Sequence, residues 1–282
     1  MEYLILFIII FSQSVGSIFI KQYNIKTGNR SAYVYGGCMM LSAAVFFLVT
    51  SQGLIFTTDF LGYSLGFGVS YAAAIIGTNL SFRHGSIALT TLVTSLALMI
   101  PTMYGIVCLG EPVGIWLVLG IVMLVLSLCL INLKKDDKKI SSKWVIFAGI
   151  AFVGNGMCST IQKMEQVAFE GAYKNEFMIV ALLMVSVIVF ILSFITEKTE
   201  IIYCIKKGGI YTILAGFCNG LVNLLVMVLG SMMPTSIMFP LISALGIIGS
   251  FGVGRFVFKE KLNTMQLAGL LAGIISIVFF NL

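Results

Sequence analysis

The segment from Gly208 to Gly254 contains no charged residue and no histidine over 47 consecutive positions. An apolar helix needs about 20 residues to cross the ~30 Å hydrocarbon core of a bilayer, so this segment is long enough for two membrane-spanning helices. Residues 230–234 (Gly-Ser-Met-Met-Pro) supply a turn between them. A soluble domain is about one quarter charged, whereas this chain is 10% charged and 59% apolar. The sequence therefore predicts an integral membrane protein in a lipid bilayer.

Apolar runs of similar length recur along the whole chain. They are continuously apolar and do not alternate in ten-residue pieces, which favours helices over a β-barrel. We therefore expect an all-α membrane protein with ten transmembrane helices. Their expected bounds are 3–21, 33–52, 60–82, 86–109, 113–133, 144–163, 177–196, 209–230, 235–255 and 263–281.

The two halves of the chain carry matching residues. One matched set, 142 residues apart, is Gln13, Ser17 and Lys21 with Asn155, Ser159 and Lys163. A second, 149 residues apart, is Glu111, Gly120, Asn132 and Leu133 with Glu260, Gly269, Asn281 and Leu282. Five spans per half is an odd number, so the second half must enter the membrane upside down. We expect two inverted five-helix repeats, residues 1–133 and 144–282, joined by a basic linker at 134–143.

The positive charges lie unevenly between the expected spans. The loops after the first, third, fifth, seventh and ninth helices carry 15 of the 17 Lys and Arg residues, and only Lys163 and Lys174 lie on the other side. By the positive-inside rule, this places both termini outside the cytoplasm and the 134–143 linker within it. We expect a multi-pass protein of the plasma membrane. The first span follows Glu2 and is too long for a signal peptide.

Two polar stripes are the first candidates for a substrate site. Residues four apart share one helical face, so Gln13, Ser17 and Lys21 form a line on one helix. Asn155, Ser159 and Lys163 form a second such line. Polar side chains in a span face the protein interior or a water-filled path, so both stripes are expected to line a shared cavity. The alternative is that they only join helices, with the two lysines reaching to the membrane surface.

A third candidate is the amide pair Asn219 and Asn223, four residues apart in an apolar span. The corresponding positions at an offset of 149 are Ser70 and Ala74, with Tyr71 beside them. Two amides on one apolar face are costly unless they are hydrogen-bonded, which favours either a binding site or a buried bond. We expect Tyr71, Asn219 and Asn223 to bind substrate.

Several kinds of chemistry lack support in the sequence. The six cysteines are scattered without metal-ligand spacing, and no cofactor or nucleic-acid partner is expected. No hydrolase, phosphate-loop or zinc-protease motif is present, so we do not expect an enzyme. No Asp or Glu falls deep in an expected span, Glu165 included. Since proton-coupled carriers usually keep an acidic residue in the membrane, this pattern favours facilitated exchange.

These residues resemble the drug/metabolite transporter superfamily, specifically its ten-helix EamA-type members. The resemblance covers essentially the whole chain and is most specific at the Gly110-Glu111-Pro112 turn and at Lys259-Glu260-Lys261-Leu262. It implies a two-fold inverted architecture, a central cavity and alternating access. Small four-helix relatives carry a glutamate eight residues before a lysine, and Gln13 and Asn155 take that place here. The resemblance implies transport of metabolites rather than proton-coupled export of hydrophobic cations.

We therefore expect an exporter or exchanger of a small polar metabolite, such as an amino acid or nucleoside. One alternative is a flippase for a lipid-linked sugar or another amphiphile. Another is a non-transporting membrane subunit or sensor, in which the stripes only pack helices. Gly-x-x-x-Gly pairs such as Gly216 and Gly220 allow a homodimer, although internal packing also explains them.

Overall fold

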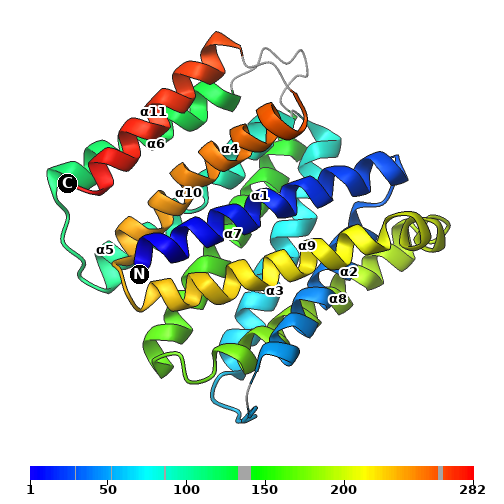
Figure 1. The fold of residues 1–282 in the computed structure, drawn as a ribbon. Helices are drawn as coiled ribbons and strands as arrows, with labels where there is room; N and C mark the ends of the chain where they lie inside the picture. The colour runs from blue at the N-terminus through cyan, green and yellow to red at the C-terminus, as the bar shows by residue number, and fades with distance from the viewer. Residues whose placement is uncertain (29, 52, 86, 133–140, 260–262) are drawn as a thin grey trace. The chain divides into compact units, whose positions relative to one another are not determined.

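The computed structural model describes residues 1–28, 30–51, 53–85, 87–132, 141–259 and 263–282, and all regular structure in these ranges is helical (Figure 1). The helices are α1 (Glu2–Thr27), α2 (Ala32–Thr50), α3 (Leu61–His84), α4 (Ile87–Leu96), α5 (Met99–Cys108), α6 (Ile115–Asn132), α7 (Ser142–Phe169), α8 (Lys174–Thr196), α9 (Ile201–Gly230), α10 (Thr235–Gly252), the π-helix η1 (Val253–Val257) and α11 (Thr264–Phe280).

Each of the ten expected segments overlaps a helix, but the fourth is broken in two. Pro101 has no N–H to donate to the carbonyl oxygen of Ala97, and its ring crowds that carbonyl. The Ala97 carbonyl instead accepts a hydrogen bond from the Ile100 amide at 3.0 Å, three residues away. The chain therefore leaves α4 at Leu96 and re-enters a helix at Met99.

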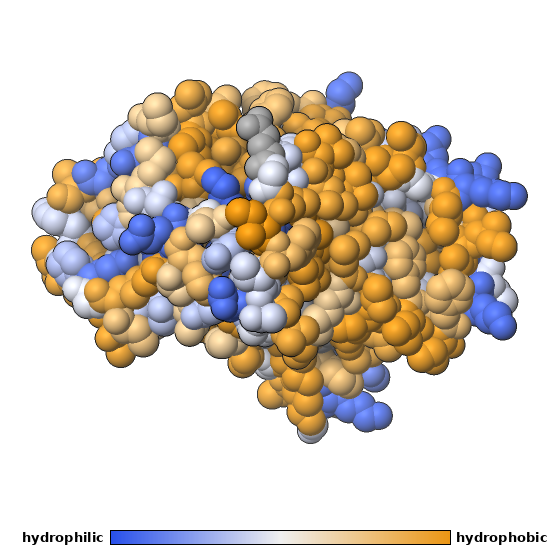
Figure 2. Space-filling view, turned by 90° about the horizontal axis from the view of Figure 1, so that it is seen from below, coloured by the Kyte–Doolittle hydropathy of each residue, from blue (hydrophilic) through white to orange (hydrophobic). Residues whose placement is uncertain are grey.

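The apolar character predicted from the sequence is confirmed in the described residues. Eight helical segments there are long and apolar enough to cross a membrane, counting Leu89–Cys108 and Thr235–Val257 as one each. Two shorter apolar helices are Ile115–Ile131 and Thr264–Phe280. Hydrophobic side chains make up most of the surface seen in Figure 2, and hydrophilic ones gather in separate patches. The chain is a multi-pass membrane protein.

The chain forms two compact units that each draw on both predicted repeats. The first unit contains residues 1–72 and 164–231, and the second contains residues 73–163 and 232–282. The helices α3 and α7 each begin in one unit and end in the other. A compact unit is not the same as a sequence repeat, so the repeats at 1–133 and 144–282 remain a prediction. Most of the predicted linker, residues 133–140, lies outside the described residues.

In the first unit, α1 and α2 pack against α9, and α2 also packs against α8 (Figure 1). Glycines permit this close approach: a Cβ atom at Gly216 would lie 2.5 Å from the Met39 carbonyl oxygen. The Ser186 hydroxyl of α8 donates a hydrogen bond to the Gly37 carbonyl of α2 at 3.0 Å. Small residues at helix crossings, with a hydroxyl bonding across them, are typical of packing in a membrane.

In the second unit, α6 and α11 lie side by side through two equivalent contacts (Figure 1). A Cβ atom at Gly120 of α6 would lie 2.5 Å from the Phe280 ring of α11. One at Gly269 of α11 would lie 2.6 Å from Ile131 of α6. The beginning of each helix thus meets the end of the other, so the two helices are antiparallel.

Candidate functional site

The candidate polar residues Tyr71, Asn219 and Asn223 are brought together in the first unit. Asn223 donates a hydrogen bond from Nδ2 to Asn219 Oδ1 at 3.1 Å. Asn219 in turn donates from Nδ2 to the Tyr71 hydroxyl oxygen at 3.4 Å. The three side chains form a short hydrogen-bonded row, which we call the amide row, between α9 and α3. The sequence pattern had predicted both the helix and the face.

The amide row lies in apolar surroundings. The central part of α9 has no charged residue, and all three side chains of the row are half-buried. The Tyr71 ring meets Phe67 edge-to-face, with 5.5 Å between ring centroids. An amide has two donor hydrogens and an acceptor oxygen, so a row of two amides and a phenol can bind polar groups of a solute.

The stripe on α1 also belongs to the first unit. The face of α1 that is buried includes Ile9, Gly16 and Tyr23, and a Cβ atom at Gly16 would lie 3.6 Å from Cys218 of α9. Gln13 and Lys21 lie beside this face and are half-buried, whereas Ser17 is exposed. The Ser17 hydroxyl donates to the Gln13 carbonyl at 3.0 Å. The hydroxyl hydrogen of Ser17 is therefore already bonded within its own helix.

The second stripe, Asn155, Ser159 and Lys163, belongs to the second unit and lies on α7. All three side chains are half-buried. Asn155 donates from Nδ2 to the Ala151 carbonyl at 2.8 Å, which leaves its Oδ1 as an acceptor. Glu111 lies within electrostatic range of Lys163. Since the two stripes belong to different units, their meeting in one cavity remains a prediction.

Glu111 caps the beginning of α10, a role that the sequence had not indicated. Its Oε1 accepts a hydrogen bond from the Thr235 amide at 2.7 Å, and its Oε2 accepts one from the Ser236 amide at 2.6 Å. These are the first two residues of α10, and the preceding Pro234 provides no side-chain cap. Partial burial opposes ionisation of this carboxyl, but the bonds from Ser236 and Thr235 prevail and hold the pKa of Glu111 below its usual range.

Two other glutamates join separate segments of the first unit. Glu197, next to the end of α8, accepts hydrogen bonds from the Ser31 hydroxyl and, at 3.2 Å, from the Tyr33 amide at the beginning of α2. Glu176, in the first turn of α8, accepts one from the Ile55 amide at 2.8 Å. Each of these side chains thus holds two segments of the first unit together.

Glu165 differs from these glutamates. The sequence placed it beyond the end of a helix expected at 144–163, and this was wrong because α7 continues to Phe169. The Glu165 side chain is 0% exposed, and neither carboxyl oxygen has a hydrogen-bond partner among the described residues. An acidic residue is thus enclosed within a membrane-spanning helix, contrary to the expectation from the sequence.

Within the described ranges, no group of three or more His, Cys, Asp or Glu side chains is arranged to hold a metal ion. The six cysteines are free thiols, and Cys158 and Cys204 are buried.

Comparison with known proteins gives the fold. Among solved structures, 28 chains match. One of them, described only as the crystal structure of a protein, aligns with a TM-score of 0.78 and 10% sequence identity, over 99% of this chain and 95% of the other. At such low identity the likeness shows the fold alone. No family model and no curated protein matches the sequence.

Proposed function

We propose that this protein is a carrier that moves a small polar metabolite, such as an amino acid or nucleoside, across the plasma membrane by alternating access. The observation that carries the proposal is the amide row. Asn219 and Asn223 stand in the charge-free part of α9 that follows Lys207, where they bond to each other and Asn219 bonds to Tyr71. A polar row inside the membrane is costly to keep and typically marks a substrate path.

The chemistry of the candidate residues indicates the class of solute. The amide row and the residues Gln13, Ser17, Asn155 and Ser159 offer neutral donors and acceptors. Lys21 and Lys163 add positive charge, and no acidic side chain is among the candidates. Such a set suits a neutral, zwitterionic or weakly anionic solute better than a cation, because the two lysines repel a cation and no carboxylate among the candidates can pair with it.

The same proposal includes ten spans arranged as two inverted repeats of the EamA type within the drug/metabolite transporter superfamily. Support comes from α6 and α11, where Gly120 meets Phe280 and Gly269 meets Ile131. Gly120 precedes Gly269 by 149 positions, and Ile131 precedes Phe280 by the same number. Each contact is therefore the equivalent of the other under a two-fold rotation. For antiparallel helices that span a membrane, such an axis lies in the membrane plane, as in inverted-repeat carriers.

A ligand-binding experiment tests the proposed function directly. The melting temperature of the purified protein is measured against amino acids, nucleosides, sugar phosphates, quaternary cations and lipid-linked sugars. A ligand at 100 times its dissociation constant stabilises the folded form by about 2.7 kcal/mol if it does not bind the unfolded chain. We expect one class of amino acid or nucleoside to raise the melting temperature, and Asn219→Ala to weaken that shift.

The same panel separates the other candidate functions. A shift from lipid-linked sugars alone would indicate a flippase for an amphiphile. If no compound stabilises the protein, and Asn219→Leu with Asn223→Leu raises its melting temperature, the amide row is a packing device. That result would indicate a non-transporting membrane subunit. Ser231→Ala is the control, because Ser231 is exposed after the end of α9 and its hydroxyl donates to the Val228 carbonyl of the same turn.

A further inference from the structure

Glu165 is the one carboxyl group in the described part of the chain that is both fully enclosed and without a hydrogen-bond donor. The described glutamates with low exposure otherwise have donors: Glu176 is bonded to the Ile55 amide, and Glu197 to Ser31 and Tyr33. A carboxylate taken out of water without donors or a paired cation is far less stable than the neutral acid. Enclosure without a donor therefore favours the protonated form of Glu165.

Two charged groups act on Glu165 within the first unit, and both come from the beginning of α8. They are Glu176 and Lys174. Glu176 already serves as the acceptor for Ile55, and its negative charge opposes a second negative charge nearby. Lys174 acts in the opposite direction. The charge on Glu165 therefore depends on how α8 begins relative to the end of α7.

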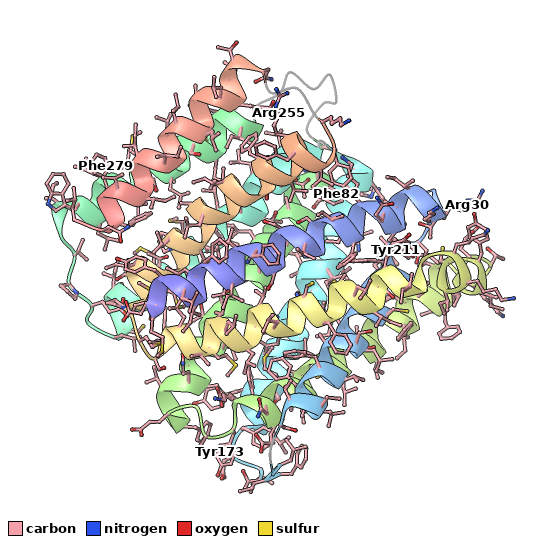
Figure 3. The ribbon with its side chains drawn as sticks, in the orientation of Figure 1. Arg30, Phe82, Tyr173, Tyr211, Arg255 and Phe279 are labelled. Atoms are coloured by element: carbon pink, nitrogen blue, oxygen red, sulfur yellow. The ribbon has the colours of Figure 1, made fainter. Side chains whose placement is uncertain are left out.

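Aromatic rings close the end of α7 that follows Glu165. Phe169 is one helical turn farther along and so lies on the same face. Its ring contacts Tyr63 and Tyr173, with centroid distances of 5.6 and 5.2 Å. Tyr173, labelled in Figure 3 at the turn that follows α7, also contacts Phe60 at 5.6 Å. These ring contacts join the end of α7 to the beginning of α3 and to the turn before α8.

The turn between α7 and α8 is short and adopts an uncommon backbone. Glu170 has φ 52° and Gly171 has φ 79°, both in the left-handed region. A non-glycine residue in that region stores strain. Lys174 and Glu176 both lie within six residues of Glu170. A change in the backbone of this turn would therefore move both residues relative to Glu165.

We propose that Glu165 is a proton-binding site, occupied in this conformer and emptied when the end of α7 opens to water. The neighbouring Gln166 donates a hydrogen bond to the Met227 carbonyl of α9, so opening would also act on the helix that carries the amide row. In a carrier, a site of this kind links a conformational step to proton uptake and release. The site itself does not depend on the proposed transport function.

Infrared spectroscopy of the protein in lipid tests the site without any transport assay. At neutral pH we expect a carbonyl-stretch band of a protonated carboxylic acid that shifts in heavy water. The band should be absent from Glu165→Gln and retained in Glu170→Gln, which removes the same charge from an exposed position in the adjoining turn. If Glu165→Gln keeps every such band, Glu165 is ionised and the proposal is wrong.

The pH dependence of melting gives an independent test. The folded protein keeps the Glu165 proton, whereas the unfolded chain releases it above about pH 4.3. The wild-type protein therefore loses stability as the pH rises above that value. Relative to wild type, Glu165→Gln should gain melting temperature between pH 5 and pH 8, and Glu170→Gln should not. A relative loss for Glu165→Gln would mean that the wild-type carboxylate is charged and paired.

Chemical labelling of the wild-type protein avoids any question about folding of the variant. Dicyclohexylcarbodiimide reacts with protonated carboxyl groups in apolar surroundings, where the acid proton moves to the carbodiimide nitrogen and the carboxylate oxygen adds to its central carbon. Peptide mass spectrometry should locate the adduct at Glu165, with labelling that declines as the pH rises. Adducts elsewhere but none at Glu165 would contradict the proposal.

Discussion

Ser186 of α8 donates its hydroxyl hydrogen to the carbonyl oxygen of Gly37 on α2, and the two residues are 149 positions apart in the chain. The same offset separates Gly120 from Gly269 and Ile131 from Phe280. In the second unit this offset relates two contacts rather than two touching residues, because Gly120 lies against Phe280 and Gly269 against Ile131.

Ser186→Ala removes this bond and leaves the Gly37 carbonyl with only its helical partner. An interhelical hydrogen bond in a membrane protein contributes about 0.6 kcal/mol on average to the free energy of unfolding. We expect Ser186→Ala to lower that free energy by an amount of this order. Gly37→Ala should cost more, because its Cβ atom would lie 3.0 Å from the Phe190 ring. Thermal unfolding in detergent measures both. If Gly37→Ala were as stable as Ser186→Ala, close packing of α2 against Phe190 would not require a glycine at position 37.

Gly120→Val should destabilise the second unit by about 1–3 kcal/mol, because its side chain would overlap the Phe280 ring. Gly269→Val should have a similar effect through Ile131. Gly149→Ala serves as the control, because a Cβ atom there meets nothing within 4 Å. The double variant Gly120→Ala with Phe280→Ala should recover part of the stability that Gly120→Ala alone loses. Failure of that rescue would place the cause of the instability elsewhere.

Glu111→Ala should lower the free energy of unfolding by about 1–2 kcal/mol, because the first two amides of α10 would lose their acceptor. The pH dependence follows from the direction of the shift. The pKa of Glu111 is lower in the folded state than in the unfolded chain, so its contribution is fully present above roughly pH 4.3. It is lost as the pH falls through the folded-state pKa.

Melting curves of wild type and Glu111→Ala should therefore converge as the pH is lowered from 6 toward 3. Glu200→Ala is the control, because its carboxylate pairs with the exposed Arg30 at 3.6 Å and contributes little. A gap between wild type and Glu111→Ala that stays constant with pH would show that the Glu111 carboxylate does not act as a charged cap.

Asn219→Ala should weaken solute binding more than Asn223→Ala does. Asn219 bonds to both Tyr71 and Asn223, whereas Asn223 is the donor at one end of the row. A lost hydrogen bond costs about 0.5–1.5 kcal/mol net, which is up to roughly a tenfold rise in the dissociation constant. Tyr71→Phe should fall between wild type and Asn219→Ala. Unchanged binding in all three variants would remove the amide row from the site.

Both chain termini are expected to face away from the cytoplasm. A protease added to intact cells should therefore remove an epitope tag from either end of the protein. In inside-out vesicles both tags should be protected. Removal of one tag but not the other in intact cells would mean an odd number of spans. Protection of both in intact cells would reverse the orientation inferred from the lysines and arginines.

The positions of the helices could be predicted from the sequence because apolar runs separated by charges are a strong signal. The ends were less certain. Charges were taken as helix ends, but α9 begins at Ile201 and carries Lys206 and Lys207 on exposed positions. The break after α4 was missed as well. Pro101 breaks a helix whereas Pro240 lies inside α10, and only the surrounding packing distinguishes these cases.

The amide row was predicted because two amides four residues apart on an apolar face give a clear pattern. The capping role of Glu111 depends on Thr235 and Ser236, more than 120 residues away in the chain. The enclosure of Glu165 depends on the extension of α7 and on α8. Neither has a local signal in the sequence, since a glutamate near a helix end most often faces water.

The paired contacts between α6 and α11 have the self-complementary form of the interface in a symmetric dimer, in which one patch meets a copy of itself. The match is incomplete: Gly273 lies beside Ser127 on one side, whereas the position that corresponds to Gly273 in the proposed first repeat is Leu124. Ser127 accordingly bonds to the Gly269 carbonyl at 2.6 Å, while its counterpart Ser276 has no hydrogen-bond partner among the described residues. Each such difference is a point at which the interface between α6 and α11 departs from two-fold symmetry.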